Sequence, residues 1–137
     1  MLANGNFGVN VKIRAIESND APAASGGYSQ AVELSGHERL LYISGQIPVD
    51  LNGEVPAGFA AQCRLVWQNI EAQLKAADMS LANLVKVTTY LSDRQFREEN
   101  SKIRQEVLTG VSPALTIIIT GIYDEAWLLE IDAIATA

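Results

Sequence analysis

The chain has 137 residues, 48% of them hydrophobic, and a formal net charge of −6 at pH 7. This length and composition fit one globular domain, and the basic residues are scattered singly, which argues against binding to a nucleic-acid backbone. The single cysteine, Cys63, excludes an internal disulfide and is consistent with a reducing compartment.

The N-terminal residues differ in composition from the rest of the chain. Residues 1–10 alternate Asn and Gly and are expected to form a flexible tail ahead of one domain at 11–137. This start lacks the basic residues and apolar run of a signal peptide, and no window approaches the roughly 18 apolar residues of a membrane span. We therefore expect a soluble, cytoplasmic protein.

In the N-terminal part of the domain, the pattern of apolar residues is typical of β-strands. Residues 11–16 alternate apolar with charged side chains, which predicts a half-buried strand. Two further strand-like runs, 28–34 and 39–44, flank Ser35-Gly-His-Glu, a sequence typical of a hairpin turn. The sequence therefore predicts three strands before the first helix.

The spacing of the apolar residues then changes to that of an α-helix. Apolar residues recur at spacings of three and four over 59–77, which predicts an amphipathic helix of about five turns. A strand is expected at 84–91. A second helix is expected to begin at Ser92 or Asp93, either of which can cap it, and to run to Leu108.

Two apolar strands close the chain, at 112–120 and 127–135. In the second, Glu130 and Asp132 share one face with two apolar side chains. A face of this kind fits either a cleft that contains Glu130 or an ordinary solvated strand, and both interpretations stay open.

The order of elements is β-β-β-α-β-α-β-β, with no repeat and no linker. It predicts an α+β sandwich in which both helices cover one face of a single mixed sheet. The other face of the sheet would be apolar and exposed, which predicts self-association.

Three residues are candidates for a site: Tyr28, which follows a glycine pair, Asn100 and Glu130. Asn100 lies on the apolar stripe of the second helix, where it could orient a site or tie down a loop, and Tyr28 could equally be an ordinary edge-of-core residue. Cys63 is expected in the core, and His37 has no second His or Cys as a co-ligand, so no metal site is expected. The residues alone predict a fold but not a reaction.

Five segments of the chain form a recognisable set. They are, in order, APAASGGYSQA (21–31), YISGQIP (42–48), NGEVPA (52–57), VKVTTYL (85–91) and LEIDAIA (129–135). From about residue 11 to the end, their sequence and order resemble the RidA family, also called YjgF or L-PSP endoribonuclease. The resemblance implies a chorismate-mutase-like α+β fold and a homotrimer whose sheets form a central barrel, with ligand clefts between subunits.

Family members of the RidA type hydrolyse reactive enamines and imines, such as 2-aminoacrylate, to 2-oxo acids and ammonia, without a metal or cofactor. By matching position, the resemblance implies that Glu130 holds or activates the attacking water, since desolvation in a cleft raises the basicity of a carboxylate. It also implies a set of ligand-binding residues: Tyr28, Ser44, Gly45, Asn100, Leu115, Thr116 and Ile117.

The chain departs from the family at Leu115. The family motif Pro-Ala-Arg-Ser/Thr is here PALT (113–116), so the arginine that clamps the substrate carboxylate is absent. Arg94, Arg97 and Arg104 of the second helix are candidates to reach a cleft from a neighbouring subunit, although their position on the helix predicts solvent exposure.

The sequence leaves three functions open. The first is hydrolysis of an imine or enamine that is neutral or differently anchored, with Glu130 and its water retained. The second is a non-catalytic trimeric protein that binds a small, less anionic ligand, which Leu115 favours. The third, from the older family label, is RNA cleavage, and the net charge of −6 with no basic stripe argues against it.

Overall fold

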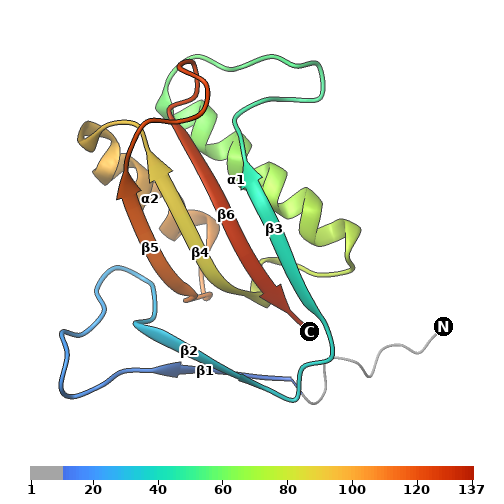
Figure 1. Ribbon diagram of the computed structural model, residues 1–137, viewed down its shortest axis with the longest axis vertical. Coiled ribbons are helices and arrows are strands. Elements are labelled where there is room, and N and C mark those ends of the chain that lie inside the picture. The colour runs from blue at the N-terminus through green and yellow to red at the C-terminus, as the bar shows by residue number, and fades with distance from the viewer. Residues whose placement is uncertain (1–10) are drawn as a thin grey trace.

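One mixed sheet of four strands organises the fold (Figure 1). The computed structural model describes residues 11–137. Across the sheet the strands are β3 (Leu40–Gln46), β6 (Leu129–Thr136), β4 (Leu84–Leu91) and β5 (Ala114–Ile119). The β4–β5 pair is parallel, whereas β6 pairs antiparallel with both β3 and β4.

Both helices cover the same face of this sheet, as predicted (Figure 1). They are α1 (Phe59–Ala76) and α2 (Arg97–Val107). The short 3₁₀ helices η2 (Leu81–Asn83) and η3 (Arg94–Phe96) precede β4 and α2. Asp93 caps η3, because its side chain accepts a hydrogen bond from the backbone N–H of Gln95 at 2.8 Å.

The core lies between the helices and the sheet. Every residue of the predicted apolar stripe of α1 from Phe59 to Leu74 is buried, including Cys63, which has no exposed surface. Burial raises the pKa of the Cys63 thiol to about 12, so this cysteine is an inert core residue. On β6 the buried residues Leu129 and Ile131 face the helices, which confirms the predicted alternation of that strand.

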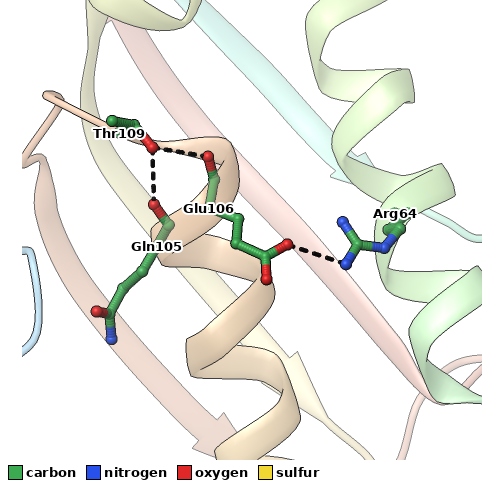
Figure 2. Close-up of polar contacts among 4 residues, drawn as sticks. All are labelled: Arg64, Gln105, Glu106 and Thr109. Atoms are coloured by element: carbon green, nitrogen blue, oxygen red, sulfur yellow. Dashed lines mark hydrogen bonds and ion pairs between the residues drawn. The ribbon is translucent and has the colours of Figure 1, made fainter.

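A polar contact joins the two helices, and two others lie at the C-terminal end of α2 (Figure 2). Nη2 of Arg64 on α1 lies 3.0 Å from Oε2 of Glu106 on α2. At the end of α2, the hydroxyl of Thr109 donates to the carbonyl oxygens of Gln105 and Glu106 at 3.3 and 2.9 Å. The side chain of Gln105 points away from Arg64, so α2 turns one side to α1 and the other to the N-terminal segment (Figure 2).

The prediction of a single sheet was wrong for the first two strands. β1 (Lys12–Ile16) and β2 (Ala31–Ser35) pair antiparallel in a two-stranded sheet of their own. The predicted hairpin around Ser35 is also wrong, since β2 pairs with β1 and β3 pairs with β6. The backbone explains this: the N–H of Arg39 donates to the carbonyl of Ala137 at 2.8 Å, and the N–H of Ala137 donates back to Arg39 at 3.1 Å. The chain after β2 is therefore held at the C-terminus and does not fold back on β2.

The segment before β2 is attached to the sheet at one end of β5. The backbone N–H of Ser29 donates to the carbonyl of Pro113 at 3.0 Å, and its hydroxyl donates to the carbonyl of Ser112 at 2.6 Å. Ser29 also forms an isolated parallel bridge to Ala114. These contacts bring Tyr28 close to β5, which begins 86 residues later in the sequence. The flexible tail expected at 1–10 lies outside the described residues.

Candidate functional site

The predicted site residues lie on opposite faces of the sheet. Glu130 lies between two residues that are buried beneath the helices, Leu129 and Ile131, so its own side chain points to the open face. Leu115 is in register with Val87 of β4, which is fully buried under the helices, so Leu115 lies on the helix-covered face. A single chain therefore does not bring Glu130 and Leu115 together.

The carboxylate of Glu130 lies directly against the backbone of Gly45. A Cβ at position 45 would overlap Oε2 of Glu130 and would lie 2.7 Å from its Cδ. Only glycine leaves room for the carboxylate there. Ser44 is exposed on the same strand, and its carbonyl accepts a hydrogen bond from Nε2 of Gln46 at 3.0 Å. Three of the predicted residues, Glu130, Gly45 and Ser44, are thus close together at one end of the sheet.

Glu130 and Asp132 border a hollow of about 320 Å³ on the open face, together with Tyr90. The hydroxyl of Tyr90 donates to Oδ2 of Asp132 at 3.0 Å, which holds that second carboxylate in place. Burial raises the pKa of Glu130, and the negative charge of Asp132 raises it further. A carboxylate of raised pKa is a stronger base than an ordinary glutamate, which suits it to accept a proton from water.

A second hollow, of about 500 Å³, lies beside α2 on the helix-covered face. Tyr28, Leu115 and Ile117 all border it. Gly26 and Gly27 precede Tyr28 with φ angles of 85° and 78°, which glycine adopts without strain. These two residues turn the chain so that Tyr28 lies over the hollow, where it is half-buried.

Thr116 and Asn100 lie apart from the other predicted residues. Thr116 alternates with Leu115 and points to the open face, where its hydroxyl accepts a hydrogen bond from Nζ of Lys86 at 2.7 Å. Asn100 is 1% exposed on the inner side of α2, and within residues 11–137 neither Oδ1 nor Nδ2 has a hydrogen-bond partner. The structure therefore does not bring Thr116 and Asn100 to the same surface.

The predicted solvent exposure was wrong for Arg104. It is 4% exposed and borders the second hollow, whereas Arg94 and Arg97 are exposed as expected. Its Nη2 donates to the carbonyl of Gly26 at 2.8 Å, and burial lowers the pKa of its guanidinium. The signal that could have found it is its spacing: Arg104 follows the buried Asn100 by four residues, so the two share one side of the helix.

Among residues 11–137, no group of three or more His, Cys, Asp and Glu residues could hold a metal ion. None of the helices described here is long and apolar enough to cross a membrane.

Comparisons with known proteins give one consistent answer. The family model described as endoribonuclease L-PSP matches residues 18–137. The chain is 43% identical over 81 residues to a RutC family protein of Pasteurella multocida, a match that spans 58% of this chain and 60% of that protein. It is 35% identical over 124 residues to a 2-iminobutanoate/2-iminopropanoate deaminase of Rattus norvegicus, which covers 89% of this chain and 88% of the relative.

A solved structure supports the same relationship. The Rid family protein YyfB from Yersinia pestis, described as of unknown function, superposes with a TM-score of 0.80 and 27% sequence identity, over 91% of this chain and 98% of that one. The family model, the curated relative of nearly full length and the shared fold agree. The chain therefore belongs to the RidA/YjgF family, the family of the endoribonuclease L-PSP model.

Proposed function

We propose that this protein hydrolyses a small imine or enamine to a carbonyl compound and ammonia, with Glu130 as the general base. The observation that carries the proposal is the Glu130 carboxylate, which lies against Gly45 and has a pKa raised by burial and by Asp132. The sequence similarity to a 2-iminobutanoate/2-iminopropanoate deaminase supports the same reaction class.

The proposed reaction needs one base and one water. Glu130 accepts a proton from the water as its oxygen attacks the C=N carbon, and the nitrogen takes up a proton to give a carbinolamine. The carbinolamine then collapses: the C–N bond breaks, ammonia leaves with the second proton, and the C=O bond forms. An enamine enters the same sequence as its imine tautomer, which forms by protonation at carbon and loss of a proton from nitrogen. Since Glu130 returns the proton that it takes, the carboxylate is regenerated in each cycle.

The catalytic site is proposed to form between two subunits of a homotrimer. Two features support this: the predicted site residues divide between opposite faces of one chain, and the open face carries large exposed apolar side chains. Of these, Tyr42 is 70% exposed and Ile118 is 42% exposed. Packing of that face against neighbouring copies would cover both side chains. In the arrangement that we propose, Glu130 of one subunit also lies next to the hollow at Leu115 of the next.

A trapping assay tests the proposal. An amino-acid oxidase or dehydratase generates imines in situ, and semicarbazide captures those that are not hydrolysed. The wild-type protein is expected to suppress semicarbazone formation, and Glu130→Gln is expected to lower that activity by roughly 100-fold or more, since general bases typically contribute 10²–10⁴-fold. The matched control is Glu125→Gln, the same change at an exposed carboxylate close to β6. Equal activity of wild type and Glu130→Gln would refute the role of Glu130.

Binding without chemistry is the second candidate. It is favoured by Leu115, the leucine that stands where the family resemblance leads us to expect arginine, and by Ile117 in the same hollow. This candidate predicts that a small neutral carbonyl compound such as pyruvamide binds the protein while no imine is hydrolysed faster than in its absence.

A further inference from the structure

Arg104 is buried, and residues 11–137 provide a hydrogen-bond partner for only part of its guanidinium. Its guanidinium forms one hydrogen bond, from Nη2 to the carbonyl of Gly26 at 2.8 Å. Nε and Nη1 have no hydrogen-bond partner within residues 11–137, which leaves three N–H donors unused. A guanidinium stays protonated in proteins, so this is a buried cation with donors to spare.

Within residues 11–137, the hollow beside Arg104 has no acidic residue in its lining. The side chains around the hollow are polar but neutral, or apolar, and no aspartate or glutamate is among them. The nearest acidic residue along α2, Glu106, lies on the other side of the helix and is paired with Arg64 at 3.0 Å (Figure 2). Burying an unpaired charge is strongly unfavourable unless an anion comes to it. The hollow is therefore suited to an anionic ligand.

Gly26 borders the hollow without a side chain of its own. A Cβ at this position would lie 3.8 Å from Nη2 of Arg104 and 3.5 Å from Nε2 of Gln105, so the missing side chain leaves both groups close to the hollow. A carboxylate that enters at this point can replace the Gly26 carbonyl on Nη2, and rotation of the guanidinium toward the hollow would bring it the N–H groups of Nη1, which are buried and without a partner within residues 11–137. It then forms the two parallel hydrogen bonds that a guanidinium favours.

We propose that Arg104 is the residue that binds the substrate carboxylate in this protein, in place of an arginine at position 115. The inference rests on the proposed function, and it assigns the carboxylate of the small 2-imino acid that the family resemblance implies to a residue of α2. Leu115 borders the same hollow, so the substrate carboxylate lies against Arg104 and its short alkyl group lies against Leu115 and Ile117. The anion is held from the helix side of the hollow, and the strand side supplies apolar contact.

The test compares two probes of nearly the same size and shape, the anion pyruvate and its neutral amide, pyruvamide. Isothermal titration calorimetry on the full chain is expected to show that wild type binds pyruvate about tenfold more tightly than pyruvamide, or better, as a charge-assisted pair provides. Arg104→Gln is expected to bind both probes equally, and Arg104→Lys is expected to keep part of the preference. The matched control is Arg97→Gln, which removes an exposed arginine of the same helix and should leave the preference unchanged.

A purely structural role for Arg104 gives a different result. Loss of the contact to Gly26 would weaken both probes together and leave their ratio as in wild type, and that outcome would overturn the proposal. Absence of a pyruvate preference in wild type would overturn it as well. If Arg104→Gln does not fold, Arg104→Lys decides: it keeps the charge but not the planar fork, so the preference for pyruvate should fall while the affinity for pyruvamide stays as in wild type, and an unchanged preference would overturn the proposal.

Binding and turnover separate the two proposals. An Arg104-dependent preference for pyruvate in a protein that hydrolyses no imine would refute the proposed reaction and leave the anion site intact. Imine hydrolysis that is unaffected by Arg104→Gln would refute the anion site and leave the reaction intact.

Discussion

At the scale of single residues, Glu130 links the stability of the protein to pH. Its folded pKa is raised, so between the ordinary pKa of glutamate and the raised value the folded state holds a proton that the unfolded state has lost. The free energy of unfolding therefore falls as the pH rises through this window, and it stays lower at neutral pH.

Glu130→Gln removes this dependence, because glutamine does not ionise. We expect the variant to unfold at a higher temperature than wild type at pH 8, and at about the same temperature in acid, where wild-type Glu130 is also neutral. Thermal denaturation at both pH values measures the difference. Asp132→Asn provides a control: it removes the second cause of the raised pKa and should shrink the same pH effect without abolishing it. A variant that is destabilised equally at both pH values would contradict this account.

The position of Glu130 could be predicted from the sequence, whereas that of Arg104 could not. Strand alternation is a strict local rule, so Glu130 lies on the face opposite Leu129 wherever the strand is placed. The burial of Arg104 depends on Gly26, which lies 78 residues earlier in the sequence and covers the helix only in the folded chain. A helical wheel treats arginine as a solvent residue and has no means to anticipate such a cover.

At the scale of elements, one buried glutamine holds the start of β6 against α1. Gln62 is 3% exposed, and its Nε2 donates to the carbonyls of Pro56 at 3.1 Å and Ala126 at 3.0 Å. Its Oε1 accepts from the backbone N–H of Leu128 at 2.8 Å, two residues before Glu130. These three bonds fix the direction in which β6 enters the sheet.

Gln62→Met keeps the size of the side chain and removes all three hydrogen bonds. We expect the free energy of unfolding to fall by about 2 kcal/mol or more, because buried backbone groups are left without partners. Urea denaturation measures the loss. The same change at the exposed Gln68 of α1 is the control and should alter stability by less than about 0.5 kcal/mol. If the two variants lost equal stability, the three bonds would not be the cause.

The sequence predicted the elements well but not the partners of the first two strands. Local periodicity identifies a helix or a strand, and the boundaries of α1 and β4 agree with the prediction almost residue for residue. Strand partners depend on contacts that are distant in sequence, such as the pair of backbone hydrogen bonds between Arg39 and Ala137. A turn sequence at 35–38 indicates that the chain changes direction there, but not which strand it leaves and which it joins.

At the scale of the whole molecule, the division of the site between two faces gives a test of assembly. Tyr28 borders the hollow on the helix-covered face, and Glu130 borders the one on the open face, and no residue is common to the two hollows. If the site forms between subunits, Tyr28 and Glu130 act together only when they come from different chains. Defects placed in separate subunits can then be complemented, whereas defects within one self-contained site cannot.

We therefore predict that two inactive variants regain activity when they are mixed. Tyr28→Ala removes the aromatic wall of one hollow, and Glu130→Gln removes the base of the other. When equal amounts are unfolded, combined and refolded, about one quarter of the interfaces pair an intact Tyr28 with an intact Glu130, so about a quarter of wild-type imine hydrolysis should return. Light scattering should give a mass of about 44 kDa for the mixture, three times the 14.8 kDa of one chain. Each variant refolded alone is the control, and a mixture no more active than these controls would mean that both residues serve a site within one chain.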